Sequence, residues 1–171
     1  MIKLIKPDKN YLQSYIDAFL EYKKYNITNY NFSNPLEYDI FEKFERYEFE
    51  RDIPKDHVGS LYCWLVDDEK GMFIGEINIR YRLNDNLLKR GGNIGYGVRK
   101  DQWGKGYGTL MLDKALAKAK ELGLERVLIT CDDNNIASAR VMEKNGFVLE
   151  DKIENIIDYK KITTRRYWKT I

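Results

Sequence analysis

The order of apolar and polar residues predicts a chain in which helices and strands alternate. An apolar residue recurs every three or four positions in four segments, as it does along one face of a helix. The expected helices are 8–24, 35–51, one that ends at Leu122 and one that runs from Asn134 or Asn135 to Gly146. Shorter alternating or continuous apolar runs predict strands at 2–6, 61–66, 72–83, 93–98, 126–130, 147–157 and 162–169. Polar residues 26–34 and 84–92 are expected to form loops.

A glycine-rich loop separates the expected strand at 93–98 from the helix that follows it. The loop carries Gly104, Gly106 and Gly108 at alternate positions. Glycine adopts positive φ at no steric cost, so the loop can turn its backbone N–H groups to one side. The first turn of the helix adds unpaired N–H groups and the positive end of the helix dipole. This arrangement predicts a cradle for a pyrophosphate.

The alternation of elements predicts an α/β core with antiparallel flanks. The 171 residues suit one domain. Lysine and arginine together number 29, against 27 aspartates and glutamates, and this balance argues against nucleic acid or a membrane surface as the main partner. We see no secretory signal, no membrane-length apolar run and no disulfide framework, so the expected location is the cytoplasm.

Three motifs resemble those of the GNAT superfamily of acyl-CoA-dependent N-acetyltransferases. The first looks like the family's pyrophosphate loop, with Trp103 in place of the usual Arg or Gln; it comprises Trp103, Gly104, Lys105, Gly106, Tyr107, Gly108 and Thr109. The second, residues 131–138, has Asn135 where the family places an Asn beside the pantetheine arm. The third, residues 143–147, is similar to the family's Glu-Lys-x-Gly-Phe. Residues 91–96 also look like a Gly-Gly-His-Ile-Gly-Tyr run of one acetyltransferase subfamily.

The resemblance implies a mixed central sheet flanked by helices. The sheet would be mostly antiparallel, with a splayed parallel pair formed by 93–98 and 127–131. It also implies one acetyltransferase domain over 1–171, with acceptor-side helices in 1–60 and a CoA-binding core in 72–170. Acetyl-CoA is the implied cosubstrate, with its pantetheine between the splayed strands and its thioester oxygen near the Val98 N–H. No metal is expected, since no Cys/His cluster suggests one, and a homodimer is a family-level expectation.

The sequence departs from the family pattern at both positions that usually transfer protons. The reaction needs a neutral amine, a donor for the carbonyl oxygen and a proton for the leaving thiolate. Asn93 stands where many members have Glu, and an amide is not a base at neutral pH. Met142 stands where many members have Tyr. We therefore expect Asn93 to hold a water, and take Glu76, Tyr96 and Ser138 as the other candidate catalytic groups; Ser138 could also contact the cofactor.

Each of these candidates has a plainer interpretation. The pattern around Glu76 favours a solvent-facing strand carboxylate. Tyr96 is equally typical of a core aromatic, and Ser138 of a serine in the first turn of a helix. His57 is expected to be a solvated loop residue, and Cys131 a buried and inert thiol.

Two groups of residues carry alternatives that concern the substrate. Four arginines could touch the 3′-phosphate of the cofactor or an acidic acceptor, or lie on solvated strand edges; they are Arg80, Arg82, Arg165 and Arg166. The Tyr and Phe residues between 11 and 49 are expected to pack on the sheet, in preference to forming a substrate-facing wall.

The sequence therefore predicts an acetyl-CoA-dependent N-acetyltransferase. Its acceptor would be a primary amine of a small molecule or a peptide, to which the acetyl group passes directly. The alternative is a CoA-binding sensor or interaction module with little or no catalysis, and the residues at 93 and 142 fit that alternative too.

Overall fold

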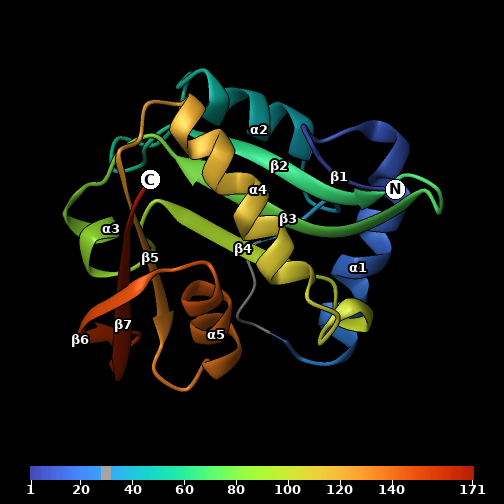
Figure 1. Ribbon diagram of the computed structural model, residues 1–171. Coiled ribbons are helices and arrows are strands. Elements are labelled where there is room, and N and C mark those ends of the chain that lie inside the picture. The colour runs from blue at the N-terminus through green and yellow to red at the C-terminus, as the bar shows by residue number, and fades with distance from the viewer. Residues whose placement is uncertain (28–31) are drawn as a thin grey trace.

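The computed structural model describes residues 1–27 and 32–171, and Figure 1 shows its helices and strands in order. The helices are η1 (Lys9–Tyr11), α1 (Leu12–Lys24), α2 (Ile40–Glu48), α3 (Asp85–Lys89), η2 (Lys100–Gln102), α4 (Tyr107–Glu121) and α5 (Ile136–Lys144). The strands are β1 (Ile2–Ile5), β2 (Ser60–Asp67), β3 (Met72–Arg80), β4 (Ile94–Val98), β5 (Arg126–Asp132), β6 (Val148–Ile157) and β7 (Lys160–Thr170).

The strands form two sheets. The first has the order β1-β2-β3-β4 and the second the order β5-β7-β6, and neighbours in both are antiparallel. The β2–β3 turn contains Gly71 at φ +59°, a conformation that glycine adopts without strain. The mixed α/β fold with flanking helices is confirmed.

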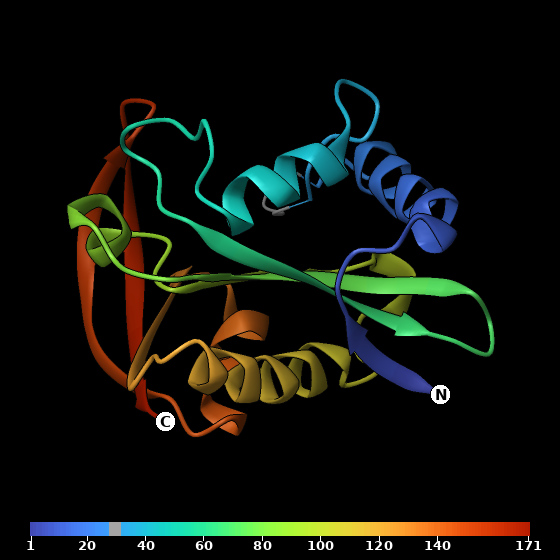
Figure 2. The same cartoon turned by 90° about the horizontal axis from the view of Figure 1, so that it is seen from above.

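Helices cover both faces of the first sheet. Figure 2 shows α1 and α2 on one face, and α4 on the other. The α1/α2 face is packed with aromatic rings from helices and strands, including Tyr15, Phe44, Trp64 and Phe73. The α4 face is mainly aliphatic and includes Ile77, Ile79, Met111 and Leu112. The prediction that the N-terminal aromatic residues pack on the sheet is confirmed for most of them. Tyr25, Tyr38 and Phe49 are exposed instead, and Tyr30 lies outside the described residues.

The two sheets meet where the chain enters β4. The Asn93 N–H donates to the Leu128 carbonyl at 2.7 Å, and Gly92 forms an isolated antiparallel bridge with Ile129. A Cβ at position 92 would lie 2.3 Å from the Leu128 oxygen, so the contact requires glycine. The expected parallel pair is not seen: β4 and β5 form no ladder in the described residues. The backbone turns at Gly92, which has φ +65°, and the strands join different sheets.

Two expected element boundaries move for local reasons. The second helix begins at Ile40 instead of Pro35, because the Asp39 carboxylate caps it by accepting from the Phe41 N–H at 2.8 Å. The segment expected to be a loop at 84–92 contains α3, whose N-terminus is capped by the side chain of Asn84. The loop expected at 26–34 lies partly outside the described residues.

Candidate active site

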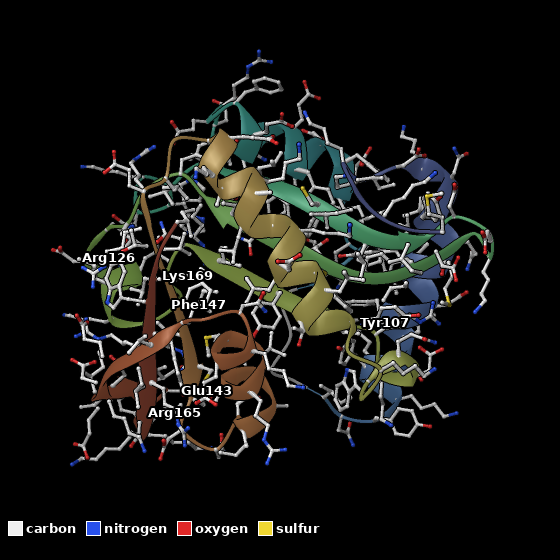
Figure 3. All side chains as sticks on the ribbon, viewed as in Figure 1. Tyr107, Arg126, Glu143, Phe147, Arg165 and Lys169 are labelled. Carbon is white, nitrogen blue, oxygen red and sulfur yellow. The ribbon has the colours of Figure 1, made fainter. Side chains whose placement is uncertain are left out.

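The glycine loop presents free backbone N–H groups at the start of α4. Gly104 and Gly106 have φ of +75° and +82°. The first backbone hydrogen bond of this turn runs from the Leu110 N–H to the Gly106 carbonyl at 3.1 Å. The N–H groups of Tyr107, Gly108 and Thr109 have no acceptor in the described part of the chain. Figure 3 labels Tyr107 at this end of the helix. The loop and the helix dipole together form a site for an anion.

Space for a ligand is left open at this end of α4. A Cβ on Gly104 or Gly106 would meet no atom within 4 Å, so their positive φ, and not crowding, favours glycine there. Gly108 differs, because its Cβ would lie 3.2 Å from Val141 of α5. Lys105 extends from the loop and donates to the Gln102 side chain at 3.1 Å. The open surroundings of Gly104 and Gly106 and the positive end of the helix dipole are compatible with a bound pyrophosphate.

The end of β4 is tied to both the loop and the N-terminal helix. The Val98 carbonyl accepts from the Trp103 indole at 2.6 Å and also from the Tyr22 hydroxyl of α1. The Trp103 ring is otherwise half exposed, with the Lys100 ammonium 5.8 Å from its centroid. Trp103, which replaces the usual Arg or Gln, therefore fixes the strand end to the loop through its indole N–H.

The structure brings together three of the residues predicted from the sequence. The Tyr96 hydroxyl lies 2.8 Å from the Ser138 Oγ and 3.3 Å from the Ser138 carbonyl. The Asn135 side chain caps α5 by accepting from the Ser138 N–H at 3.0 Å. Burial raises the pKa of the Tyr96 phenol, so its proton stays in place at neutral pH. A protonated hydroxyl pair thus stands between β4 and the first turn of α5.

Asn93 lies apart from this pair and connects the sheets. Its Oδ1 accepts from the Leu128 N–H at 2.9 Å, and its amide donates to the Arg80 carbonyl at 3.4 Å. The residue is 2% exposed. Met142, where many family members have a tyrosine, lies fully in the core of the α4 face. The side chain of Asn93 is thus already used for backbone hydrogen bonds.

Glu76 is buried, and the interpretation of it as a solvent-facing carboxylate is wrong. It is 2% exposed and accepts from the Trp64 indole at 2.8 Å. Burial raises its pKa to about 8, although the hydrogen bonds of Trp64 and Tyr15 and the charge of Lys43 act in the opposite direction. Glu76 pairs with Gly97 across the β3–β4 ladder, whereas Tyr96 pairs with Ile77. Side chains alternate between faces along a strand, so Glu76 and Tyr96 lie on opposite faces of the sheet.

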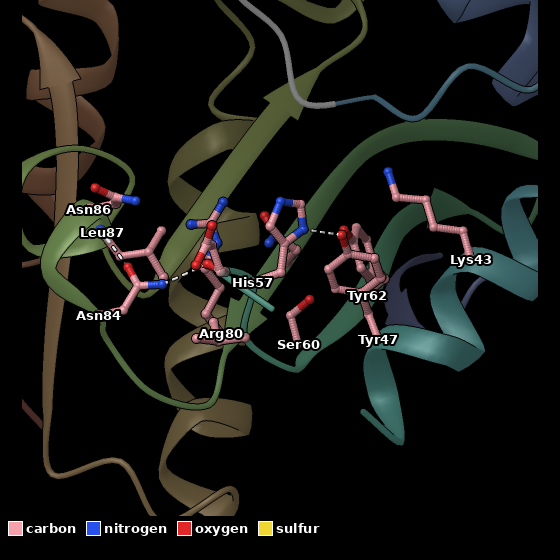
Figure 4. A pocket seen from close by; sticks show the side chains of 12 residues that line it. Lys43, Tyr47, His57, Ser60, Tyr62, Arg80, Asn84, Asn86 and Leu87 are labelled. Carbon is pink, nitrogen blue, oxygen red and sulfur yellow. Dashed lines mark hydrogen bonds between the residues drawn. The ribbon is translucent and has the colours of Figure 1, made fainter. Parts of the chain in front are cut away.

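A pocket of about 410 Å³ opens on the face that carries Glu76. Its floor includes Ser60, Tyr62, Asn78 and Arg80 from β2 and β3. Figure 4 shows Lys43 and Tyr47 of α2 on one side of Arg80, and Asn84, Asn86 and Leu87 on the other side. His57 also lines the pocket, and its Nδ1 is hydrogen-bonded to the Tyr47 hydroxyl.

The sequence did not point to the pocket as a unit. Lys43 and Asn78 were not among its candidates, although Glu76, Asn78 and Arg80 alternate along one expected strand and so share a face. His57 was expected to be merely solvated; it is exposed, but it also faces this pocket.

Other candidates are engaged elsewhere. Arg165 pairs with Asp133 at 2.6 Å and Arg166 with Asp151 at 2.5 Å, both in the second sheet; Figure 3 labels Arg165 there, away from Tyr107. Cys131 is buried, and burial raises the pKa of its thiol to about 11, which fits the inert thiol expected.

Within residues 1–27 and 32–171, no group of three His, Cys, Asp or Glu side chains is placed to hold a metal ion. In the same residues, no helix has the length and apolar character needed to span a membrane.

The fold has close counterparts among solved structures. A microcin C7 self-immunity acetyltransferase, solved with acetyl-CoA and AMP, superposes with a TM-score of 0.74 at 20% identity, over 99% of this chain and 92% of that chain. A ribosomal L7/L12 α-N-protein acetyltransferase, solved with coenzyme A, gives 0.73 at 16% identity, over 99% and 94%. A GNAT acetyltransferase from Streptococcus pneumoniae gives 0.66 at 19% identity, over 100% of both chains. At these identities the likeness shows the fold.

Comparison at the level of sequence identifies the family. No curated protein matches the sequence significantly. The family description "Acetyltransferase (GNAT) domain", however, matches residues 13–148, which is most of the chain. The match includes the glycine loop, β4 and α5, where the free N–H groups and the Tyr96–Ser138 pair lie. The chain therefore belongs to the GNAT family of acetyltransferases.

Proposed function

We propose that this protein uses acetyl-CoA to acetylate a primary amine of a small molecule or a peptide. The observation that carries the proposal is the set of unpaired N–H groups at Tyr107, Gly108 and Thr109, behind a glycine loop with open space in front of it. Membership of the acetyltransferase family supports the choice of donor, as do the ligands named for two of the structural neighbours. When bound, acetyl-CoA supplies a thioester carbon open to attack by a neutral amine.

The chain's own residues would hold the cofactor at both ends of this site. The N–H groups of residues 107–109 and the loop residues 103–106 would bind the pyrophosphate. Asn135 and Ser138, at the start of α5, would face the pantetheine arm. The edge of β4 that does not pair with β3, with the Val98 N–H near its end, would orient the thioester oxygen.

The two proton transfers would take place on opposite faces of β4. Glu76, on the α1/α2 face, is proposed to accept the amine proton; a carboxyl group with a pKa near 8 is a matched base at mildly alkaline pH. Tyr96, on the other face and hydrogen-bonded to Ser138, is proposed to protonate the leaving thiolate. The amine would then arrive from one side of the strand while the thiol departs on the other.

Asn93 is proposed to act indirectly in this scheme. Its side-chain oxygen already accepts from Leu128, which leaves little capacity to hold a water for the amine. We assign it the task of fixing the distance between β4 and β5. The helices within residues 1–60 would shape the acceptor side, because Lys43 and Tyr47 of α2 line the pocket on the face of the sheet that carries Glu76. The cytoplasmic location and the homodimer stay predictions.

The test of the cradle is the stabilisation of the fold by acetyl-CoA. At about 100 times Kd, a ligand adds roughly 2.7 kcal/mol to the free energy of unfolding, which should raise Tm by several degrees. Gly106→Asp places a negative charge where the pyrophosphate would lie and should abolish the shift. Gly123→Asp is the matched control, because Gly123 has φ +83° and equally open surroundings but lies beyond the other end of α4. An absent shift, or equal shifts in the two variants, would refute the cradle.

The alternative, a CoA-binding module with little or no catalysis, shares the cradle and so also predicts this shift. It differs in the proton-transfer groups, which it does not need. The placement of a buried carboxyl and a buried phenol on either face of β4 favours the enzyme.

A further inference from the structure

The pocket on the Glu76 face of the first sheet holds more positive than negative charge. Arg80 lies in its floor and Lys43 in the wall made by α2. One carboxylate, that of Asp56, also lines the pocket from the exposed loop before β2. Asp56 forms no ion pair with either cation, and the other lining groups at Ser60, Tyr62 and Asn78 are neutral.

Arg80 is held in place without a counter-ion. Its Nη1 donates to the carbonyls of Gly91 at 3.2 Å and Gly92 at 3.0 Å. Its other donors, Nε and Nη2, have no acceptor among the described residues, and no carboxylate pairs with it there. Desolvation by the surrounding protein lowers the pKa of Arg80. By contrast, Arg82, two residues further along, is exposed and pairs with Glu50.

Lys43 has no carboxylate partner in the described residues either. It donates to the Ser33 Oγ at 2.8 Å and the Tyr38 hydroxyl at 3.4 Å. Glu76 is mainly protonated at pH 7, since its pKa is near 8, and when it is ionised as the proposed base its charge acts on Lys43 and not on Arg80. The pocket therefore offers two cationic groups, one of them anchored by backbone carbonyls, to a bound ligand.

Building on the proposed function, we propose that the acceptor carries an anionic group, a carboxylate or a phosphate, which Arg80 binds while Lys43 contributes a second positive charge. A planar guanidinium with free N–H donors matches either oxyanion. Polyamines and aminoglycosides are excluded as preferred acceptors by the same charges, because their extra ammonium groups would face Arg80 and Lys43.

Strand β3 also sets the distance between the anionic group of the acceptor and its reacting amine. Arg80 and Glu76 are four residues apart on one face of β3, so their Cα atoms lie roughly 13 Å apart at about 3.3 Å per residue. The Arg80 guanidinium bonds to Gly91 and Gly92, before β4, whereas Glu76 pairs with Gly97 near the end of that strand. An acceptor that binds Arg80 in the pocket and extends along β3 toward Glu76, which does not itself line the pocket, is longer than a single α-amino acid and comparable to a short peptide.

The experiment compares pairs of peptide acceptors in which one member carries an anionic group and the other does not. Trialanine, its C-terminal amide, Ala-Ala-Ser amide and its phosphorylated form share the same terminal amine, and spermidine represents the cationic class. We expect kcat/KM for the carboxylate or the phosphate acceptor to exceed that of its neutral partner by on the order of 10- to 100-fold, as loss of a charge-assisted hydrogen bond implies. Comparison of the carboxylate acceptor with the phosphate acceptor identifies which oxyanion is preferred.

Variants connect the preference to Arg80. Arg80→Gln should reduce the ratio of acidic to neutral kcat/KM to near one, and Arg80→Lys should keep part of it. Arg82→Gln, which removes an exposed arginine on the same chain segment, should leave the ratio unchanged. Equal kcat/KM for acidic and neutral acceptors, a preference for spermidine, or an unchanged ratio in Arg80→Gln would overturn the proposal.

The acetyl-CoA thermal shift separates this proposal from the proposed function. If the wild-type protein shows the shift but turns over no acidic acceptor, the anionic acceptor is wrong while the cofactor site stands. If the shift is absent, the proposed function itself fails. The shift in Arg80→Gln and Arg80→Lys also shows whether those variants are folded.

Discussion

The hydroxyl of Tyr96 lies 2.8 Å from the Oγ of Ser138, and this contact joins β4 of one sheet to the helix that follows β5 of the other. It stands on the face of β4 opposite to Glu76. Burial keeps the phenol protonated, so the pair can donate a proton to a group between the two strands. The family position usually filled by a tyrosine on α5 is Met142 in this chain, so Tyr96 of β4 is the proton donor that we propose instead.

Replacing Tyr96 by phenylalanine should lower kcat and leave the KM for acetyl-CoA nearly unchanged. The expected loss is about 10- to 100-fold, at the low end for a general acid, because Ser138 remains as a weaker donor. Steady-state kinetics of thiol release measure it. Tyr167→Phe is the matched control, since it removes a hydroxyl that bonds to Glu143 at 2.9 Å away from β4. A kcat within twofold of wild type would show that Tyr96 is a core aromatic only.

Asn93→Ala should destabilise the protein by about 1–3 kcal/mol, because the buried Leu128 N–H loses its acceptor. Urea unfolding followed by far-UV circular dichroism measures the change. Asn134→Ala, at an exposed position, provides the comparison. A variant of wild-type stability with a large loss of kcat would contradict the assigned role and would favour a direct part for Asn93 in catalysis.

Glu76 should make the protein less stable as the pH rises. Its pKa is raised from 4.5 to about 8 in the native state, so between these values the native protein keeps a proton that the unfolded chain releases. The free energy of unfolding therefore falls with rising pH across this window, by on the order of a few kcal/mol. The carboxyl group faces Trp64 of β2, Tyr15 of α1 and Lys43 of α2.

Glu76→Gln removes this titration, so the difference in stability between variant and wild type should shift in favour of the variant from pH 5 to pH 8. Urea unfolding at several pH values gives the difference directly. Glu37→Gln, at an exposed carboxylate, should show no such trend. A difference that is constant with pH would mean that Glu76 is ionised throughout.

The sequence predicted well those features that depend on neighbouring residues. The apolar stripe of Leu112, Ala115, Leu116 and Ala119 indicated the buried face of α4; Leu116 is partly buried and the other three residues are fully buried. The glycine loop before α4 was predicted for the same reason, since positive φ and a free helix end are local properties. The start of α2 shows the limit of prediction from neighbouring residues. Both Pro35 and Asp39 are compatible with a helix start, and only the structure shows that the helix begins after Asp39.

Features that depend on contacts between distant segments were not predicted. Glu76 alternates with apolar residues as an exposed residue would, and it is buried because α1 and α2 cover that face with Tyr15 and other rings. The hydrogen bond of Tyr96 to Ser138 spans 42 positions. The charge of the pocket depends on Lys43 and Arg80, which are brought together by packing of α2 on β2 and β3.

Initial rates of thiol release, with acetyl-CoA and an acidic peptide amine both varied and the products weighed by mass spectrometry, test the central claim most directly. We predict intersecting double-reciprocal lines, one thiol released per acetyl group transferred, and the acetyl group on the peptide amine. Parallel lines with an acetyl group on Cys131 would contradict direct transfer. Absence of thiol release with every amine, in a protein that acetyl-CoA stabilises, would contradict the enzyme and leave a CoA-binding module.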